Sequence, residues 1–178
     1  MREEAKNTKK LDNKGFSLIE LIIVIAIMAI LIGIVGTQVV PYIEKSKQAK
    51  DQQVLSGYLT AATTAFASNA DTLDDTKEYD FTIASGGVTA TKDPGEKVKD
   101  EFYELAGLTK TADAGATTTS VKIAAITDKM SSKAGKKIDK VIITRGADGK
   151  VTVTTSVSEN KYKDVFAPLS STWIGKAS

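Results

Sequence analysis

The pattern of hydrophobic positions divides the chain near residue 43. Residues 21–36 contain no charged or strongly polar side chain, and the uncharged run continues to Ile43. A run of this length can cross the ~30 Å hydrocarbon core of a membrane as a helix. Glu20 directly precedes the run, inside what otherwise has the composition of a membrane helix. A charge there costs about 2.5–3.5 kcal/mol on insertion scales, which makes this carboxylate a candidate functional group.

Beyond the apolar run the pattern becomes that of an amphipathic helix. Residues 44–53 are rich in helix-forming residues. Apolar residues then recur at helical spacing and define one face: Val54, Leu55, Tyr58, Leu59, Ala62, Ala65 and Phe66. The pattern predicts one helix from Phe16 to about Ser68, ~80 Å long at 1.5 Å per residue. Its first half is apolar on all sides, and its second half has one face to bury.

Three residues interrupt this predicted helix: Gly33, Gly36 and Pro41. Pro41 lacks the backbone N–H that an α-helix requires, so we expect a kink near it. The two glycines have a second interpretation, because small residues also permit close packing between neighbouring helices.

The rest of the chain, residues 69–178, predicts a small domain with an antiparallel sheet. Strand-like alternation occurs in residues 79–83, 88–91, 140–144 and 150–155. The last two segments flank Gly146-Ala147-Asp148-Gly149, as the strands of a β-hairpin do. A long helical spine followed by such a sheet indicates an α+β fold.

Between these strands the pattern is weaker. Residues 97–108 have the spacing of a short helix, and residues 109–120 have the composition of a loop. Residues 121–126 fit a strand or a helix equally well. We expect the apolar residues of the C-terminal tail to pack onto the sheet: Tyr162, Val165, Phe166, Leu169 and Trp173.

The composition excludes several kinds of chemistry. The chain has 178 residues and contains neither cysteine nor histidine. Disulfides, zinc–thiolate sites, histidine-based catalysis and a cysteine nucleophile are therefore excluded. No glycine-rich phosphate loop or catalytic constellation is found, so we expect neither enzyme activity nor a bound cofactor.

Charge is concentrated at the start of the chain. Residues 1–15 carry five basic and three acidic side chains, and this net charge of +2 equals that of the whole chain. A basic segment before an apolar run stays on the cytoplasmic side of a membrane, so we expect the residues after the run to be exported.

Two charged clusters are candidate ligand sites. The first is acidic and has the oxygen ligands that calcium prefers, although its spacing matches no defined calcium loop: Asp71, Asp74, Asp75, Glu78 and Asp80. The second is basic: Lys129, Lys133, Lys136, Lys137 and Lys140. It suits DNA or another anionic surface, but no aromatic residues are interleaved with it. For both clusters we favour the simpler interpretation, a solvated polar segment.

The start of the apolar run carries a specific motif. Lys14-Gly15-Phe16-Ser17-Leu18-Ile19-Glu20, with the basic leader before it and the apolar run after it, resembles the class III signal of type IV pilins and type II secretion pseudopilins. In a plain membrane anchor Glu20 is only a flanking charge. In a cleaved secretory signal ending near Gly36, a carboxylate inside the apolar segment is unfavourable.

The resemblance implies that a prepilin peptidase cuts between Gly15 and Phe16 and N-methylates the new Phe16 amine. It divides the chain into a cleaved leader (1–15), a transmembrane and filament-core helix (16–40), the amphipathic half of the spine (41–68) and a globular head (69–178). Many pilins carry a helix-breaking proline slightly earlier, at the position of Thr37, so the place of any kink differs here.

The resemblance also implies a role for Glu20. In the family this carboxylate pairs with the N-terminal amine of a neighbouring subunit. Two charges in an apolar environment are tolerated when they are paired, so a subunit out of register leaves Glu20 unpaired. The pairing therefore sets the register of the subunits.

As a function, the resemblance implies a structural subunit of a type IV pilus, made in the bacterial cytoplasmic membrane and assembled into an extracellular filament. Its partners are other pilin subunits, prepilin peptidase and an assembly platform, and the filament serves adhesion, twitching motility, biofilm formation or DNA uptake. The alternatives are a pseudopilin of a secretion or competence system and, outside the family, a membrane-anchored binding module.

Overall fold

The computed structural model describes residues 15–112 and 119–171. The chain forms two compact units that divide between Tyr42 and Ile43. In the first unit, α1 (Leu18–Ile34) continues into a five-residue π-helical turn, η1 (Val35–Val39), and then into the start of α2 (Val40–Ser68). No residue of α1 or η1 is buried, although α1 consists almost entirely of apolar side chains.

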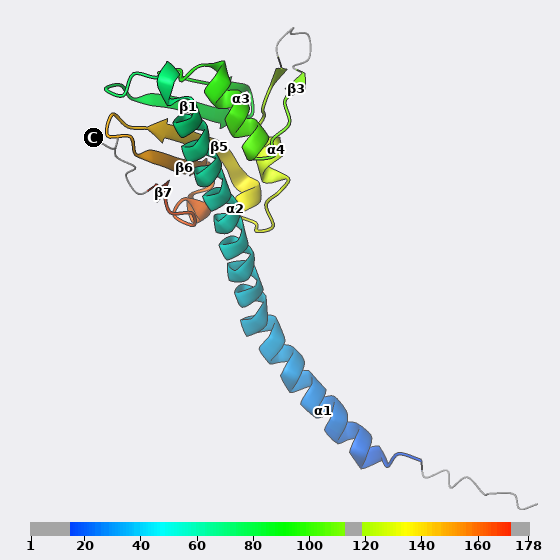
Figure 1. Ribbon diagram of the computed structural model, residues 1–178. Coiled ribbons are helices and arrows are strands. Elements are labelled where there is room, and N and C mark those ends of the chain that lie inside the picture. The colour runs from blue at the N-terminus through cyan, green and yellow to red at the C-terminus, as the bar shows by residue number, and fades with distance from the viewer. Residues whose placement is uncertain (1–14, 113–118, 172–178) are drawn as a thin grey trace, which may run out of the picture. The chain divides into compact units, whose positions relative to one another are not determined.

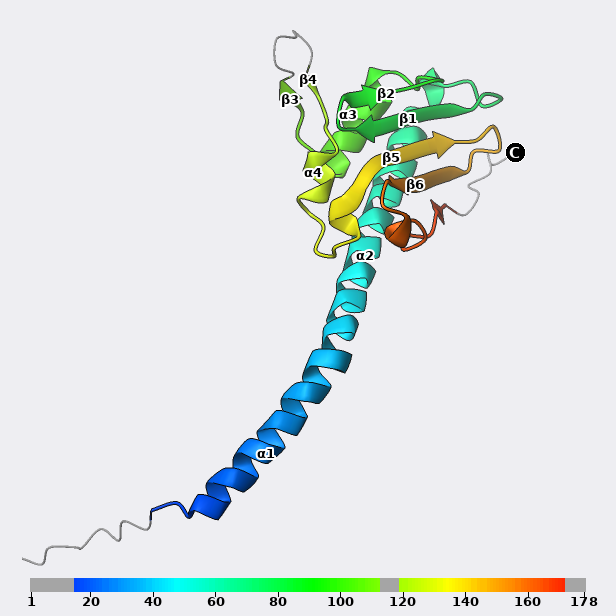
Figure 2. The same ribbon diagram turned by 180° about the vertical axis from the view of Figure 1, so that it is seen from behind.

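The second unit is built on α2, which buries one face. Its buried apolar residues follow the predicted helical spacing: Leu55, Tyr58, Ala61, Ala62, Ala65 and Phe66. This face packs against a five-stranded sheet, and α2 crosses in front of the sheet in Figure 1 and behind it in Figure 2. The prediction of a helical spine packed on a small antiparallel sheet is therefore confirmed.

The strands are β1 (Tyr79–Ala84), β2 (Gly87–Thr89), β5 (Ile138–Arg145), β6 (Val151–Val157) and β7 (Leu169–Ser170). Their order in the sheet is β2-β1-β5-β6-β7, and every neighbouring pair is antiparallel. Burial alternates along β5 and β6 because only one face of the sheet meets the core. The predicted hairpin joins β5 to β6, and Gly149 supplies the positive φ (77°) of its turn.

The helix α3 (Glu96–Leu105) completes the core beside α2. The Phe81 ring of β1 is fully buried and meets the Phe102 ring edge-on, with centroids 5.3 Å apart. Phe102 in turn meets Tyr58 of α2 at 6.3 Å. Burial raises the pKa of Tyr58 to about 12, since the ionised phenol loses its hydration. These rings join the sheet to both helices.

The C-terminus of α3 is closed by a Schellman motif. Gly107 adopts φ 61°, Leu108 N–H donates to Tyr103 O at 2.8 Å, and Gly107 N–H donates to Glu104 O at 3.0 Å. The Lys129 ammonium group also donates to Ala106 O and Gly107 O, where the helix dipole favours a cation. The end of α3 is thereby held to the loop after α4.

Three segments had weak sequence patterns, and the structure now defines most of their residues. Residues 121–126, which fitted a strand or a helix, lead into the short helix α4 (Ala124–Thr127). The expected loop at 109–120 contains a two-residue ladder between β3 (Thr111–Ala112) and β4 (Thr119–Ser120). In the tail Phe166 is buried and Leu169 packs against the core, while Trp173 lies outside the described residues.

A buried carboxylate fastens α2 to the loop that precedes β5. Asp51 is fully buried and accepts the backbone N–H groups of Ser131 (2.7 Å) and Ser132 (2.8 Å), and also the Ser132 hydroxyl. Gly135 permits this approach, since a Cβ there would lie 2.3 Å from Asp51 Oδ2. Two turns earlier on α2, Glu44 accepts Lys133 N–H at 2.6 Å. Glu44 and Asp51 together form a carboxylate clamp on this loop.

We expect Asp51→Ala to destabilise the chain strongly. The change leaves the buried N–H and hydroxyl of Ser132 and the half-buried N–H of Ser131 without an acceptor, at a cost of about 3 kcal/mol or more in the free energy of unfolding. Denaturant unfolding of the detergent-solubilised full chain measures this. Asp71→Ala, at an exposed acid, is the control and should change stability by less than about 0.5 kcal/mol. An equally small effect of Asp51→Ala would contradict the clamp.

Candidate functional site

The predicted cleavage point lies outside the helix. Gly15 and Phe16 have no regular secondary structure, and Phe16 is 92% exposed. Among the described residues beyond its two chain neighbours, no group lies within 4 Å of a Cβ built at Gly15. An exposed, non-helical peptide bond is the form that a protease can bind. That this bond is cut, and that Phe16 is methylated, stay predictions.

Glu20 forms half of a capping box at the start of α1. Ser17 is the N-cap, and its hydroxyl accepts Ile19 N–H at 3.4 Å. Glu20 Oε2 accepts Ser17 N–H at 2.8 Å. This exchange satisfies N–H groups that the helix cannot pair internally, and the helix dipole favours the negative charge. The carboxylate is thereby held back toward Phe16, and Oε1 has no partner among the described residues.

The helix behind Glu20 exposes its apolar surface on all sides. Ile22, at 47%, and Ile34, at 49%, are among the least exposed large residues of α1. Among the described residues, one helical run, Leu18–Ser68, is long and apolar enough to cross a membrane, and none of its most apolar window is buried. Apolar surface of this extent has to be covered by lipid or by another protein.

The three interrupting residues lie in or close to the π-helical turn. Gly33 lies in α1, Gly36 within η1, and Pro41 is the second residue of α2. In an α-helix the Thr37 carbonyl would accept the N–H of residue 41, but proline has none and its ring crowds that carbonyl. A wider turn just before Pro41 relieves this conflict. The Thr37 hydroxyl donates to Gly33 O at 3.1 Å, a bond of the kind that often accompanies a bend in a helix.

Four of the five acids of the cluster have partners within the head, and the Asp71 carboxylate has none among the described residues. Hydrogen bonds from Thr76, together with the Lys77 ammonium 3.0 Å away, lower the pKa of Asp74 to about 2. Asp75 pairs with Arg145 at 2.9 Å, and Glu78 pairs with Lys92 at 2.8 Å. Within residues 15–112 and 119–171, no group of three or more acids is arranged to hold a metal ion.

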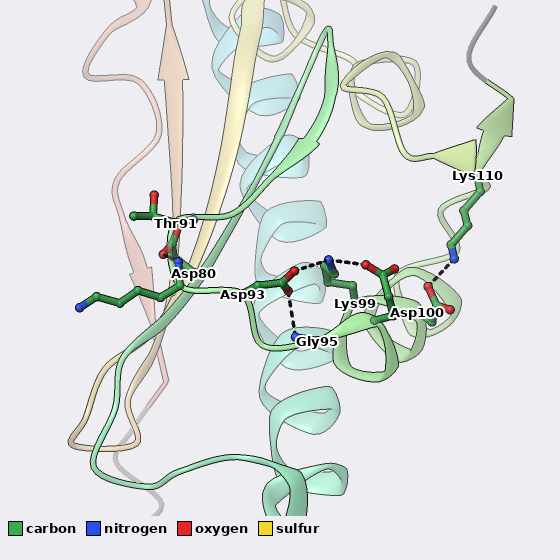
Figure 3. Close-up of polar contacts among 9 residues, drawn as sticks. Asp80, Thr91, Asp93, Gly95, Lys99, Asp100 and Lys110 are labelled. Atoms are coloured by element: carbon green, nitrogen blue, oxygen red, sulfur yellow. Dashed lines mark hydrogen bonds and ion pairs between the residues drawn. The ribbon is translucent and has the colours of Figure 1, made fainter. Parts of the chain in front are cut away.

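Asp80, the last acid of the cluster, also has partners within the head, in the segment that precedes α3. It accepts the N–H groups of Thr91 and Lys92. In Figure 3, Asp93 accepts Gly95 N–H at 2.9 Å and pairs with the nearly buried Lys99. Burial opposes the charge of Lys99, but hydrogen bonds to Glu96 and Asp93 outweigh it and raise the pKa. These acids therefore organise the loops of the head.

The basic stretch does not form one continuous free surface. Lys129 caps α3, and Lys137 pairs with Glu159 at 2.8 Å. Lys133, Lys136 and Lys140 are exposed. The stretch therefore divides into lysines that hold the fold and lysines that face outward.

Sequence reasoning missed the carboxylate clamp. Asp51 precedes Leu55 by four residues and Tyr58 by seven, which places it on the buried face of α2. A charge at such a position signals a buried, hydrogen-bonded carboxylate. The loop that satisfies it comes 80 residues later, and no local pattern identifies that partner.

These features define a class: an α+β protein with a small antiparallel head, whose spine helix begins in a fully exposed apolar segment with a carboxylate in its first turn. The comparisons agree with it. Residues 10–36 match the family model of the prokaryotic N-terminal methylation motif. The chain is 34% identical to the type IV major alpha-pilin of Moraxella bovis over 163 residues, which cover 87% of this chain and 94% of that protein. No solved structure matches. The chain belongs to the type IV pilin family.

We expect Pro41→Ala to convert the π-helical turn to a regular α-helix. The new N–H can pair with the Thr37 carbonyl, and a proline inside a helix costs about 3 kcal/mol. Hydrogen–deuterium exchange in Val35–Val39, measured in a bilayer or detergent, should slow markedly. Gly36→Ala is the control: it raises helix propensity by about 1 kcal/mol but keeps the proline, so its effect should be smaller. Unchanged exchange in Pro41→Ala would show that another feature causes the turn.

Proposed function

We propose that this chain is a structural subunit of a type IV pilus, which polymerises through its N-terminal helix into an extracellular filament. The observation that carries the proposal is the uncovered apolar surface of α1. In a membrane, lipid covers it; in a filament, the same surface packs against the corresponding helices of other subunits. The membership of the chain in the pilin family supports this sequence of events.

The proposal assigns a task to each part of the chain. Residues 1–15 are the leader that prepilin peptidase removes at Gly15–Phe16, after which Phe16 is N-methylated. Residues 16–40 span the membrane and then form the filament core. Residues 41–68 are the half of the spine that carries the head, residues 69–178. The subunit resides in the bacterial cytoplasmic membrane until an assembly platform adds it to the filament.

In this proposal Glu20 sets the register between subunits. Its Oε2 caps the subunit's own helix, which leaves Oε1 for the cationic Phe16 amine of a neighbour. A charge-assisted hydrogen bond of this type is about twice as strong as a neutral one. The role is structural rather than enzymatic, and the filament serves adhesion, motility, biofilm formation or DNA uptake.

A pseudopilin remains the second candidate, because the methylation motif suits both kinds of protein. The similarity over most of the length of a protein named a major pilin favours the pilus. Long surface fibres containing this chain would support a pilin. Their absence, with the chain confined to short assemblies in the envelope, would support a pseudopilin.

The first test is mass spectrometry of the N-terminal peptide from protein isolated from its own cells. We expect a chain that begins at N-methylated Phe16, because the Gly15–Phe16 bond is exposed and non-helical. A chain that retains Met1 to Gly15 would indicate a plain anchor. A start after Gly36 would indicate a secreted domain, and either result would overturn the proposal.

The second test separates register from helix capping. We expect Glu20→Ala to abolish filaments while the protein remains in the membrane, because the neighbour's amine then has no counter-charge. Ser17→Ala is the matched control: it removes the other half of the capping box, at a cost of about 1 kcal/mol, but keeps the carboxylate. Filaments counted by electron microscopy should persist in Ser17→Ala. Equal loss in both variants would attribute the effect to capping, and normal filaments in Glu20→Ala would favour a tethered binding module.

A further inference from the structure

Two segments far apart in the sequence meet at the end of the head where α2 enters it. The loop of residues 131–137 lies against α2 because Asp51 and Glu44 accept its backbone N–H groups. Figures 1 and 2 both show the connection between α4 and β5 beside α2. We call this region, residues 43–51 together with 131–137, the base of the head.

Four lysines of the base are exposed and have no side-chain partner among the described residues: Lys47, Lys50, Lys133 and Lys136. We call them the base lysines. The loop at 131–137 contains no acidic residue, and the acids of residues 43–51 are Glu44 and Asp51, which the loop amides occupy. The clamp therefore brings lysines from two segments to the base, where six lysines outnumber two carboxylates and leave a net positive charge.

The opposite end of the head has the opposite charge. Residues 69–80 carry five acids and one lysine, and they follow the last residue of α2, Ser68. Ser68 lies 21 residues beyond Lys47, or about 30 Å along the helix. Most of these acids are engaged, as the pairs of Asp75 with Arg145 and of Glu78 with Lys92 illustrate. The base, with six lysines and two acids, and this acidic segment therefore carry opposite net charges.

The base directly follows the apolar segment in the chain. Tyr42, 70% exposed, ends that segment, and tyrosine is typical of the headgroup level of a membrane. Lys47 follows five residues later, about 8 Å along the helix. The Debye length at physiological ionic strength is also about 8 Å, so a charge at this distance still responds to the lipid headgroups.

We propose that the base lysines form a docking surface for anionic phospholipid headgroups, which holds the head against the outer face of the cytoplasmic membrane before assembly. The inference rests on the proposed function only in taking residues 16–40 as a membrane span. Each lysine close to an anionic bilayer strengthens binding roughly fivefold. Addition to a filament exchanges this lipid contact for contacts with other subunits.

Two other partners with negative charge fit the base lysines less well than lipid. A second copy of the chain is a less suitable partner, because three acids of the acidic segment, Asp74, Asp75 and Glu78, are already paired internally. Nucleic acid fits the charge, but single strands also need aromatic stacking platforms, and none lies between the base lysines in either segment. The position next to the apolar segment favours lipid.

The test is a lysine footprint of the full chain in nanodiscs. The chain is reconstituted in phosphatidylcholine alone, or with one third phosphatidylglycerol, and treated with a membrane-impermeant acylating reagent. Mass spectrometry then gives the modification rate of each lysine. Lys97 and Lys150 are internal controls, since both are exposed and unpaired within the described residues. Lys97 lies in the first turn of α3, and Lys150 precedes Val151, whose partner Arg145 pairs with Tyr79 of the acidic segment.

We expect phosphatidylglycerol to slow modification of the base lysines roughly fivefold and to leave both controls unchanged. The protection should vanish in about 1 M sodium chloride, where the Debye length is about 3 Å. In a variant with Lys47→Gln, Lys133→Gln and Lys136→Gln, Lys50 should lose its protection. In the control variant with Lys97→Gln and Lys150→Gln, Lys50 should keep it.

Equal rates in both bilayers would overturn the proposal. So would protection in phosphatidylcholine that increases with the number of chains per disc, which would identify a second copy as the partner. Stronger protection by duplex DNA than by phosphatidylglycerol would overturn it in favour of nucleic acid.

Failure of the assembly proposal is distinguishable from failure of this one. Glu20→Ala can lose or retain filaments without changing the footprint, so that variant judges assembly alone. A chain that does not float with the lipid would overturn the docking surface and the membrane span together.

Discussion

The uncovered apolar surface of α1 is the constraint on which the rest of the molecule depends. None of its residues is buried by the chain itself, so the free energy of this segment depends on what surrounds it. A surface of this kind is stable in lipid or against similar helices and unstable in water. The polar features at its two ends therefore matter more than its interior. The capping box closes the N-terminal end of this segment, and the π-helical turn follows its C-terminal end.

The C-terminal part of the same helical run, in α2, is surrounded by protein on one face. In α2 one face is buried by the sheet, and the burial stops near Asp51, the first fully buried residue of the run. A carboxylate at that position needs donors, and the loop before β5 supplies them from backbone amides. A polar clamp of this kind fixes one position of the loop on α2, because a shift by one residue would leave buried donors and acceptors unpaired. Apolar contacts tolerate such shifts more easily.

The sequence predicted those parts whose signals are local. The helical period of α2, the alternation of β1 and the glycine turn between β5 and β6 each depend on neighbouring residues, and all three appear where expected. The ladder between β3 and β4 is only two residues long, too short for alternation to identify it. The clamp was missed for another reason: the pattern places Asp51 on the buried face, but its partners lie in a loop with no periodic signal. Reasoning from the sequence also marked Glu20 as important without revealing its capping bond to Ser17.

That capping bond changes how the register contact is understood. A Glu20 that was free in the isolated subunit would gain its first partner on assembly, and the whole cost of the buried charge would depend on the neighbour. Here Oε2 is already occupied by Ser17 N–H, so the carboxylate is oriented before any neighbour arrives. In the proposed contact, less side-chain entropy would then be lost when the amine binds. The contact with a neighbour would select between registers without also having to position the side chain, because the helix start already does so in the single subunit.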